Sequence, residues 1–403
     1  MSKIIPAVSK SALCSFLVQY HWLNNIDKLA GEPGIIKLFQ RIGSIQFDPL
    51  NMVGRNPHLV LQSRIKGFTA DMLDKVMYQD RVLIDAWDKE MSIHLTADWP
   101  YFKRIRKCRE KSVKYILERR GQENTLSYTK QILKIIQKQG PLGASEIDLG
   151  KCQASSWGHR NISGAALDYL CAKGDLGVFA KRNTQKLYDL TGRLLPEEII
   201  NAPDPFKNDN DFYEWYFLRR IKSIGVHWLK NGGAWNGYFL SDSRLRKRIF
   251  ESLEKKELIQ PIQVNGIDET FYICTQDMNL LNAKPDYDNS IKILAPLDNM
   301  LWDRALIQKV FNFTYSWEVY LPAEKRKYGY YVLPVLYQNR IIARMEPEMH
   351  RANNPFAIKK WWWEPEISIN NKIKSAVRNG LKQFAEYLQA DSIDKNTFHI
   401  IFE

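Results

Sequence analysis

Two stretches of the chain repeat one order of elements, a helix followed by two strands that a short turn joins. The second stretch carries the clearer signal, because Asn265-Gly266 separates two alternating runs and is the strongest short-range mark of a hairpin. A helix followed by such a hairpin is typical of winged-helix architecture. The copies differ in spacing by a residue or more, so we treat them as similar units and not as a strict repeat. The predicted elements are helix 160–173 with strands 176–180 and 186–190, and helix 244–256 with strands 258–264 and 270–273.

Helical periodicity prevails in the N-terminal part, and alternation typical of strands prevails after residue 290. The Pro-rich residues 201–205 separate the two copies and are predicted to be a linker. The last part is predicted to be a small β-barrel or sheet with a helical lid. The other predicted elements are helices 8–23 and 35–41, a strand at 46–48, an extended run at 58–64, a basic helix that starts near Trp99-Pro100, a short helix 144–149, strands 315–321, 329–337, 340–345 and 356–363, and helix 371–388.

The charge balance indicates an anionic partner. The 403 residues include 58 Lys and Arg against 45 Asp and Glu, a net charge of +13, and 45% hydrophobic residues are typical of a folded protein. The alternative is a solvated basic surface on an ordinary enzyme. The five cysteines and seven histidines are dispersed without metal-ligand spacing, which predicts no metal and unpaired thiols in a reducing compartment. No run suggests a signal peptide or a membrane span, so we expect a cytoplasmic protein.

Gln46 and Asp48 are the residues that most suggest chemistry. Side chains two apart on a strand share a face, so this amide and carboxylate could grip one water molecule while Ile45 and Phe47 turn into the core. The flanks are basic, and a carboxylate in a surface that attracts phosphate needs a reason to be there. The alternative is that Asp48 ends a strand or caps a turn before Pro49.

Five long motifs stand in order along the chain, and together they resemble the winged-helix DNA glycosylases that repair alkylated and interstrand-crosslinked DNA, the YcaQ/AlkZ family. The family's active-site signature is Gln, an apolar residue, then Gln or Asp, and Gln46 and Asp48 match its Asp version. The motifs are IGSIQFDPLNMVGRNPHLVLQSRI (42–65), DRVLIDAWDKEMSIHLTADWP (80–100), ALDYLCAKGDLGVFAKRNTQKLYDLTGRLLP (166–196), LAPLDNMLWDR (294–304) and LPAEKRKYGYYVLPVLYQNRIIARMEP (321–347).

The resemblance implies an α+β fold. Three tandem winged-helix domains would form a curved basic channel around duplex DNA, and a C-terminal β-barrel-like domain with a terminal helix would close it. The wing of the first domain is the least evident from the sequence. We predict domains over residues 1–121, which include Gln46 and Asp48, and over 122–205, 206–288 and 289–403.

The resemblance also implies an activity. We expect a monofunctional DNA glycosylase, free of metal and cofactor, that hydrolyses the N-glycosidic bond of N7-alkylguanine and unhooks interstrand crosslinks, with Asp48 and Gln46 activating a water. Its partner would be double-stranded DNA, it would be nucleoid-associated, and nothing in the sequence demands more than a monomer. The alternative is a non-catalytic winged-helix DNA-binding protein such as a transcriptional regulator. An RNA-directed enzyme is disfavoured, because no single-strand platform such as an RNP motif is visible.

Basic, amide and aromatic residues from several segments are candidate DNA contacts. Tyr328 and the tyrosines after it follow the cations at 325–327, and such an aromatic and basic run either lines a groove or is half core. Residues 338–340 are predicted to form a hairpin tip that probes the minor groove. Asp298 and Arg304 match a family motif, yet they could equally form a structural ion pair. The candidate contacts are Asn51, Arg55, Arg64, Arg104, Arg160, Arg182, Arg304, Lys325, Arg326, Tyr328, Gln338, Asn339 and Arg340.

Three positions depart from the family pattern. Lys89 stands where the Trp-x-His-Glu pattern has histidine, which would change the substrate range if that histidine touches the lesion. Glu346 and Glu348 replace the usual Asp and Lys, and the second change removes a positive charge. The run Trp361–Trp363 is predicted to be core packing with one exposed ring.

Overall fold

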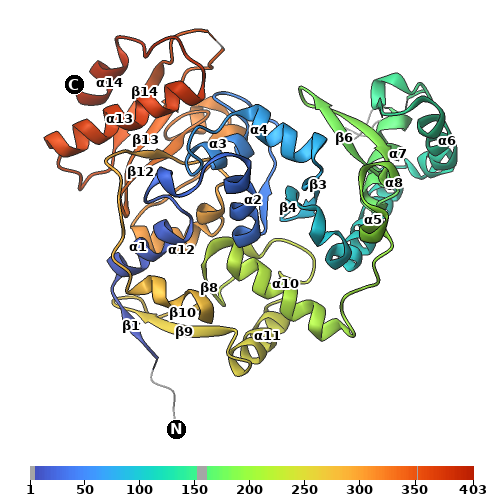
Figure 1. Cartoon of the computed structure of the whole chain (residues 1–403), viewed down its shortest axis with the longest axis horizontal. Helices are drawn as coiled ribbons and strands as arrows, with labels where there is room; N and C mark the ends of the chain where they lie inside the picture. The colour runs from blue at the N-terminus through green and yellow to red at the C-terminus, as the bar shows by residue number, and fades with distance from the viewer. Residues whose placement is uncertain (1–4, 152–160, 352) are drawn as a thin grey trace. The chain divides into compact units, whose positions relative to one another are not determined.

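The structure groups the chain into two compact units. The first, called here the terminal unit, combines Met1–Leu73 with Tyr213–Glu403, and the second, the middle unit, is Asp74–Phe212. Figure 1 shows the N-terminal helices, in blue, beside orange elements of the same unit. The boundary after Leu73 falls inside the predicted first domain, and the finer division into four domains remains a prediction. The structure, a computed structural model, describes residues 5–151, 161–351 and 353–403.

The core of the terminal unit joins both ends of the chain. Helix α1 (Lys10–Tyr20) buries Leu13, Phe16 and Leu17, which recur at helical spacing and therefore line one face. The predicted helix over 8–23 is thus confirmed. This face packs into one hydrophobic core with residues from much later in the chain, among them Ile262, Phe271, Leu306 and Leu336.

One predicted extended run is a helix instead. Residues 58–64 fall mostly in helix α3 (Asn56–Gln62), which has Pro57 in its first turn. Proline at that position favours a helix start, because its fixed φ suits the first turn and its missing N–H would be unpaired there. Periodicity could not decide the case, since Leu59 to Leu61 are consecutive buried apolar residues that suit a buried strand or a buried helix equally well.

The second predicted helix-and-hairpin copy is confirmed. Helix α11 (Ser243–Lys255) precedes the antiparallel pair β9 (Ile259–Val264) and β10 (Thr270–Cys274), and Gly266 in the turn has φ 75°. Strand β1 (Ala7–Val8) pairs with β9 in parallel, which ties the N-terminal segment to this sheet. The sheet order is β1-β9-β10-β8, with β8 at Val226–Trp228.

The C-terminal strands form an open sheet. The order β11-β12-β13-β14 has two free edges in the part of the chain that the structure describes, so the predicted barrel-like closure is wrong. The predicted strand at 315–321 is also wrong: a short 3₁₀ turn, η9 (Glu318–Tyr320), occupies it. The predicted terminal helix is confirmed as α13. The bounds are β11 Lys292–Ile293, β12 Leu333–Tyr337, β13 Arg340–Pro347, β14 Ile358–Trp363, α13 Asn371–Tyr387 and α14 Thr397–Phe402.

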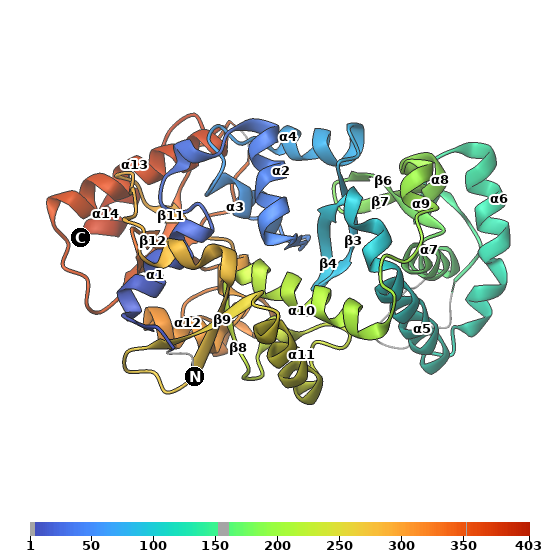
Figure 2. The same cartoon turned by 60° about the horizontal axis from the view of Figure 1, so that its bottom comes forward.

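The middle unit contains the first predicted copy. Helix α7 (Ile162–Lys173) is followed by the hairpin of β6 (Leu176–Arg182) and β7 (Gln185–Leu190), as predicted (Figure 2). The predicted helix at 144–149 is reduced to a 3₁₀ turn, η5 (Ala144–Glu146). The other elements are β3 Leu83–Asp88, β4 Glu90–Leu95, α5 Lys103–Arg119, α6 Thr129–Gln139, β5 Leu142–Gly143, α8 Thr191–Leu194 and α9 Glu197–Ile200.

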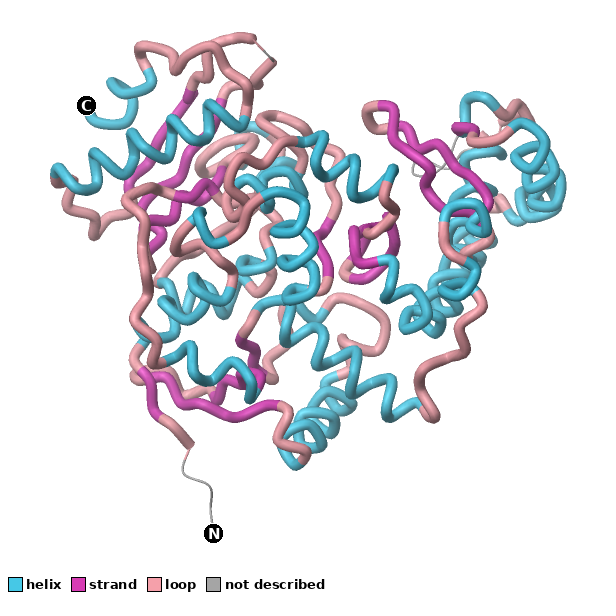
Figure 3. Tube along the Cα trace, in the orientation of Figure 1, coloured by secondary structure: helices cyan, strands magenta, loops and turns pink. Residues whose placement is uncertain are grey.

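The remaining elements are short or connect these sheets. Figure 3 shows helices and strands mixed along the chain, and most strand pairs are antiparallel, which confirms the α+β class. No helix among the described residues is long and apolar enough to cross a membrane. The remaining helices and strands are α2 Gly31–Ile42, β2 Ser44–Gln46, α4 Ala70–Asp74, α10 Asp209–Ile224 and α12 Arg304–Phe311, with a π-helical turn at Lys75–Gln79 and 3₁₀ turns at Ile26–Lys28, Thr96–Phe102, Glu123–Tyr128, Gly233–Trp235, Thr275–Leu281, Asn299–Leu301 and Ala323–Lys325.

Candidate active site

The segment with the Gln-x-Asp pattern begins as strand β2, directly after α2. Gly43 ends the helix with φ 77°, a conformation that favours glycine. Ile45 is fully buried, whereas Gln46 and Asp48 are half-buried. Because the strand ends at Gln46, Asp48 lies in the loop beyond it, so strand geometry does not set its direction. The predicted strand over 46–48 is therefore wrong in its bounds, although both side chains remain partly accessible.

The Asp48 carboxylate is held by a backbone donor. Its Oδ1 accepts a hydrogen bond from the Leu50 N–H at 2.9 Å, as in a turn that an aspartate caps. No Lys or Arg side chain among the described residues forms an ion pair with it. Burial raises the pKa of Asp48, and the Leu50 N–H opposes that shift. The local geometry is thus that of a turn capped by aspartate, as in the alternative. The capping hydrogen bond uses only Oδ1, one of the two carboxylate oxygens.

The cations that flank this loop in sequence are engaged elsewhere. The Arg41 guanidinium lies 3.6 Å from the centroid of the Trp22 ring and donates to the Tyr20 carbonyl at 3.0 Å. Lys66 pairs with Asp27 at 2.7 Å. Since these neighbours have other partners, they do not neutralise the Asp48 carboxylate.

Arg64 is a structural residue and not a phosphate contact. Its side chain is 0% exposed and makes two hydrogen bonds, of 2.8 and 2.9 Å, to the equally buried Asp298 carboxylate. The prediction that Arg64 contacts DNA is therefore wrong, because its neighbours seal it from solvent. The suggested Asp298–Arg304 pair is wrong as well. Arg304 instead donates to the Pro296 carbonyl at 2.7 Å and lies over the Tyr315 ring, and burial lowers its pKa.

Two buried asparagines fix the backbone of β2. The Asn56 amide donates to the Gln46 carbonyl at 2.7 Å, and its Oδ1 accepts the Leu297 N–H at 3.0 Å. The Asn299 amide donates to the Ser44 carbonyl at 2.9 Å. Both ends of the strand are thus tied to the loop before α12. The sequence did not single out Asn56, because it lies just before the run predicted to be extended (58–64) and belongs to no motif element that was assigned a role.

An exposed tyrosine lies near the candidate carboxylate. Tyr320 is 78% exposed, and its pKa is raised first by burial and then by the negative charge of Asp48. The same charge helps to raise the pKa of Tyr331, mainly a consequence of burial. The Trp317 ring supports Tyr320 edge-on, with 5.9 Å between ring centroids. Tyr320 is a further candidate residue of the site; it lies in the segment predicted from the sequence to be a strand, and no sequence pattern marks it.

Two buried carboxylates fix the loop that follows Tyr320. The Glu318 carboxylate accepts the backbone N–H groups of residues 327–329 at 3.0 to 3.4 Å. Glu346, which is 4% exposed, accepts the Tyr330 N–H at 2.7 Å. The family departure at Glu346 is thus a buried support for this loop, and not a residue on the surface.

Several predicted DNA contacts surround this loop. Lys325 is exposed, and the Arg326 guanidinium lies over the Tyr330 ring while its Nε donates to the Leu321 carbonyl. Tyr328 is half-buried and packs edge-on against Trp362, which matches the half-core alternative.

Two more predicted contacts precede and begin α3. Asn51 is exposed and its Oδ1 accepts the Gly54 N–H, whereas Arg55 is half-buried at the start of α3. Neither position is sealed from solvent, so DNA contact there remains a prediction.

The predicted hairpin tip docks on α1. Gln338 has φ 52° and is exposed, as the tight turn requires. The Asn339 amide donates to the hydroxyls of Ser11 and Ser15 at 3.1 and 3.0 Å. Arg340 is exposed. The turn itself is confirmed, and contact of this tip with the minor groove remains a prediction.

The predicted contacts of the middle unit differ in their accessibility. Arg104 is held by Asp204, by Asp209 and by the Phe206 carbonyl, so its charge is already paired. Arg182, on the β6–β7 hairpin, is 66% exposed, although Glu146 lies 3.3 Å from it. Arg160 lies outside the described residues.

The remaining singled-out positions have mixed surroundings. Lys89 is buried in the turn between β3 and β4, and Glu348 is exposed beyond β13. In the tryptophan run, Trp361 is buried and the other two rings are half-buried, with the Trp363 Nε1 donating to the Ile401 carbonyl.

Within the described residues, no group of three or more His, Cys, Asp or Glu side chains could hold a metal ion.

Comparison with known proteins assigns the family. Residues 39–390 match the family model described as DNA glycosylase AlkZ-like. The chain belongs to the AlkZ-like DNA glycosylase family. A solved structure, the Streptomyces sahachiroi DNA glycosylase AlkZ, matches this AlkZ-like chain with a TM-score of 0.63 and 13% identity. The match covers 96% of this chain and 98% of that one, so the two share a fold over nearly their whole lengths.

The assignment decides between the alternatives left by the sequence. An AlkZ-like DNA glycosylase is an enzyme that acts on DNA, so the family resemblance is confirmed and the non-catalytic regulator is disfavoured. Its place in the Gln-x-Asp subgroup, its catalytic residues and its lesion stay predictions.

Proposed function

We propose that this AlkZ-like glycosylase hydrolyses the N-glycosidic bond of N7-alkylguanine in duplex DNA, with Asp48 and Gln46 activating the attacking water. The observation that carries the proposal is the half-buried Asp48 carboxylate, which has no ion-pair partner among the described residues of a chain with net charge +13. A carboxylate left unpaired in a basic protein is not needed to balance charge. Its shifted pKa adds to the case, since perturbed carboxyl groups are concentrated at functional sites.

The chemistry requires one carboxylate. Alkylation at N7 makes guanine a cationic leaving group, so the base needs no general acid. The sugar then develops oxocarbenium character, and a nearby anion stabilises it more in the transition state than in the ground state. Asp48 can supply this charge and can accept the proton of the attacking water. Gln46, a neutral donor and acceptor, would orient that water.

The same arrangement suits a crosslinked base. Most glycosylases rotate the target base into a pocket, but a base tethered to the opposite strand cannot rotate out freely. Unhooking a crosslink therefore requires that the carboxylate reach the sugar within the duplex. A carboxylate on a loop at the surface, beside the exposed Tyr320, is compatible with this approach.

The test is base release from a duplex that carries N7-methylguanine. Asp48→Asn should reduce single-turnover release by about 10²- to 10⁴-fold, the range expected for loss of a general base, and DNA binding should be retained. Gln46→Ala should reduce release less. Asp71→Asn is the matched control, because Asp71 is an exposed carboxylate in the first turn of α4, and it should release base at the native rate.

The outcomes separate the parts of the proposal. Native release by Asp48→Asn would refute the role of Asp48 and leave the substrate assignment intact. Absence of release by the native protein would refute the substrate. A duplex with a guanine–guanine crosslink, tested in parallel, measures unhooking by the appearance of separated strands.

A further inference from the structure

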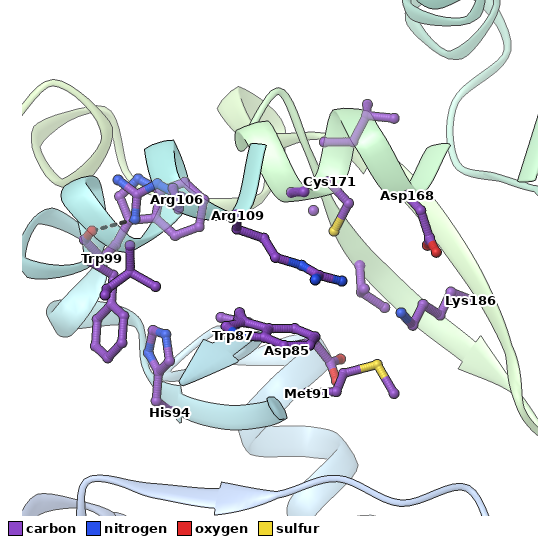
Figure 4. Close-up of a pocket in the computed structure, with 17 residues that line it drawn as sticks. Asp85, Trp87, Met91, His94, Trp99, Arg106, Arg109, Asp168, Cys171 and Lys186 are labelled. Carbon is purple, nitrogen blue, oxygen red and sulfur yellow. Dashed lines mark hydrogen bonds between the residues drawn. The ribbon is translucent and has the colours of Figure 1, made fainter. Parts of the chain in front are cut away.

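A cavity of about 140 Å³ lies within the middle unit. Helices α5 and α7 and the two hairpins β3–β4 and β6–β7 surround it (Figure 4). For comparison, an engineered apolar cavity of about 150 Å³ in another protein holds benzene. The cavity therefore has room for a molecule about one ring in size.

Part of its wall is apolar. Side chains from four different elements contribute carbon and sulfur atoms, and none of these five can form a strong hydrogen bond. A ligand that fills the cavity must therefore bring an apolar body to this wall. These residues are Ala86, Met91, Ala172, Leu176 and Val178.

Two cations face the cavity without a carboxylate partner. The Arg109 guanidinium lies 3.6 Å from the centroid of the Trp87 ring. Figure 4 shows the Lys186 side chain pointing into the cavity. Within the described part of the chain, the side chains of Arg109 and Lys186 form no hydrogen bond and no ion pair. Both charges also act on the Cys171 thiol, whose pKa burial raises to about 11. The Asp168 and Asp85 carboxylates act on the same thiol with the opposite sign, so it is the balance of charges in the wall that favours an anion.

The strand register adds to this positive charge. Lys186 on β7 is the direct cross-strand partner of Lys181 on β6, and like charges in that position destabilise a hairpin. Lys181 is neutralised by Asp85, which also accepts a hydrogen bond from the Tyr78 hydroxyl at 2.9 Å. Lys186 therefore stays without a neutralising partner on its own hairpin.

The acidic groups that face the cavity are already engaged. Asp85 is paired with Lys181, and the Asp168 carboxylate accepts a hydrogen bond from the Tyr188 hydroxyl at 3.2 Å. The third cation of the wall, Arg106, lies over the Trp99 ring at 3.8 Å and donates to the carbonyl of the same residue. The cations of the wall thus outnumber the carboxylates.

We infer that this cavity binds a small organic anion of about one ring in size. Its carboxylate or phosphate group would be bound by Arg109 and Lys186, and its apolar body would rest on Leu176 and Val178. Hydrogen bonds from these cations to an anion are charge-assisted and about twice as strong as neutral ones. The inference is independent of the proposed glycosylase chemistry, since no residue of that proposal lines the cavity.

The experiment compares four probes on the full-length protein. Isothermal titration and the midpoint of thermal unfolding are measured with benzoate, phenyl phosphate, benzyl alcohol and inorganic phosphate. Benzoate or phenyl phosphate should bind and raise the midpoint, because a ligand that binds only the folded state stabilises it. Benzyl alcohol lacks the charge and inorganic phosphate lacks the apolar body, so each should bind at least about tenfold more weakly.

Two variants and a control locate the site. Lys186→Gln should weaken binding of the preferred probe by about tenfold through loss of the charge, and Ala172→Leu should abolish it by filling the cavity. Lys107→Gln, at an exposed position of α5 that does not line the cavity, should leave binding unchanged. Absence of binding by all probes, equal binding of phosphate and phenyl phosphate, or equal binding by native protein and Lys186→Gln would overturn the inference. The probe comparison on native protein stands even if a variant fails to fold.

Discussion

At the scale of single residues, Asp48 lies in surroundings that disfavour its ionised form. Removal from water disfavours its ionised form, and the Leu50 N–H offsets this only in part. An apolar or amide residue would be more stable in such a place. Proteins keep destabilising groups of this kind where function requires them, which is the known trade between stability and activity.

The cost of burying the ionised Asp48 carboxylate predicts how the stability of the fold depends on pH. The folded-state pKa of Asp48 lies above the unfolded value of about 3.9, so ionised Asp48 destabilises the fold at neutral pH. Asp48→Asn keeps an oxygen that can accept the Leu50 N–H and should therefore raise the midpoint of thermal unfolding. The difference should shrink as the pH falls through the folded pKa and should vanish only below the unfolded pKa of about 3.9. A lower midpoint for Asp48→Asn at pH 7, with Asp71→Asn unchanged, would contradict this account.

Tyr320 is expected to contribute to DNA binding and not to the stability of the fold. An exposed aromatic ring beside the candidate carboxylate can stack on a nucleotide, which is worth about 1–3 kcal/mol by alanine substitution. Tyr320→Ala should therefore raise the KM for lesion-containing duplex by about tenfold or more and leave the thermal midpoint unchanged. Tyr320→Phe should restore binding. Tyr115→Ala removes another exposed tyrosine, on α5, and serves as the control.

At the scale of elements, strand β2 is short but held at both ends. With only three residues it has few ladder bonds, so the amide side chains of Asn56 and Asn299 supply much of its fixation. Helix α3 presents Asn56 at its first residue, next to the loop that ends the strand. The prediction of an extended run at 58–64 missed this helix, and with it the position of Asn56 at the start of the helix.

Removing the Asn56 amide should lower both stability and activity. Asn56→Ala leaves the Gln46 carbonyl and the Leu297 N–H without their partner, and each unpaired buried group costs about 1–3 kcal/mol. We expect a fall in the free energy of unfolding and a fall in kcat for base release at temperatures where the variant is folded. Asn56→Asp keeps only the acceptor, so it should retain the contact to Leu297 and lose the one to Gln46. Native kcat in the alanine variant would show that Gln46 needs no such support.

At the scale of the whole molecule, the terminal unit is closed by contacts between distant parts of the chain. Arg64 and Asp298 are 234 positions apart and meet in a buried ion pair, and α1 shares its core with residues beyond 300. The first part of the chain therefore depends on the last part for its packing. This explains why Met1–Leu73 groups with Tyr213–Glu403, across the whole middle unit.

The Arg64–Asp298 pair predicts a large stability effect and little direct effect on DNA binding. Arg64→Met leaves the buried Asp298 carboxylate without its cation, which costs about 3–5 kcal/mol. Urea unfolding should show this loss, and the double variant Arg64→Met with Asp298→Leu should recover part of it. The slope of log affinity against log salt should stay unchanged, because Arg64 releases no counterions. A smaller salt slope for folded Arg64→Met would show that the residue does contact phosphate.

The sequence by itself determined the features that depend on local pattern. The helix-and-hairpin order over 162–190 and 243–274, the apolar face of α1 and the terminal helix α13 all follow from spacing and turn residues that lie next to one another in the chain. The Gln-x-Asp pattern and the family motifs likewise needed no structure. Local periodicity failed where a consecutive apolar run suited two kinds of element, as it did for α3.

Only the tertiary structure decided which charges are available. Arg64 and Arg182 look alike in sequence, yet one is sealed against Asp298 and the other is 66% exposed. The sequence pattern likewise did not decide whether the C-terminal strands close into a barrel or whether a cation lies beside Asp48. It also did not decide which tyrosine is exposed. The physical reason is that burial and pairing depend on groups brought together from distant positions, and local periodicity contains no information on those distances.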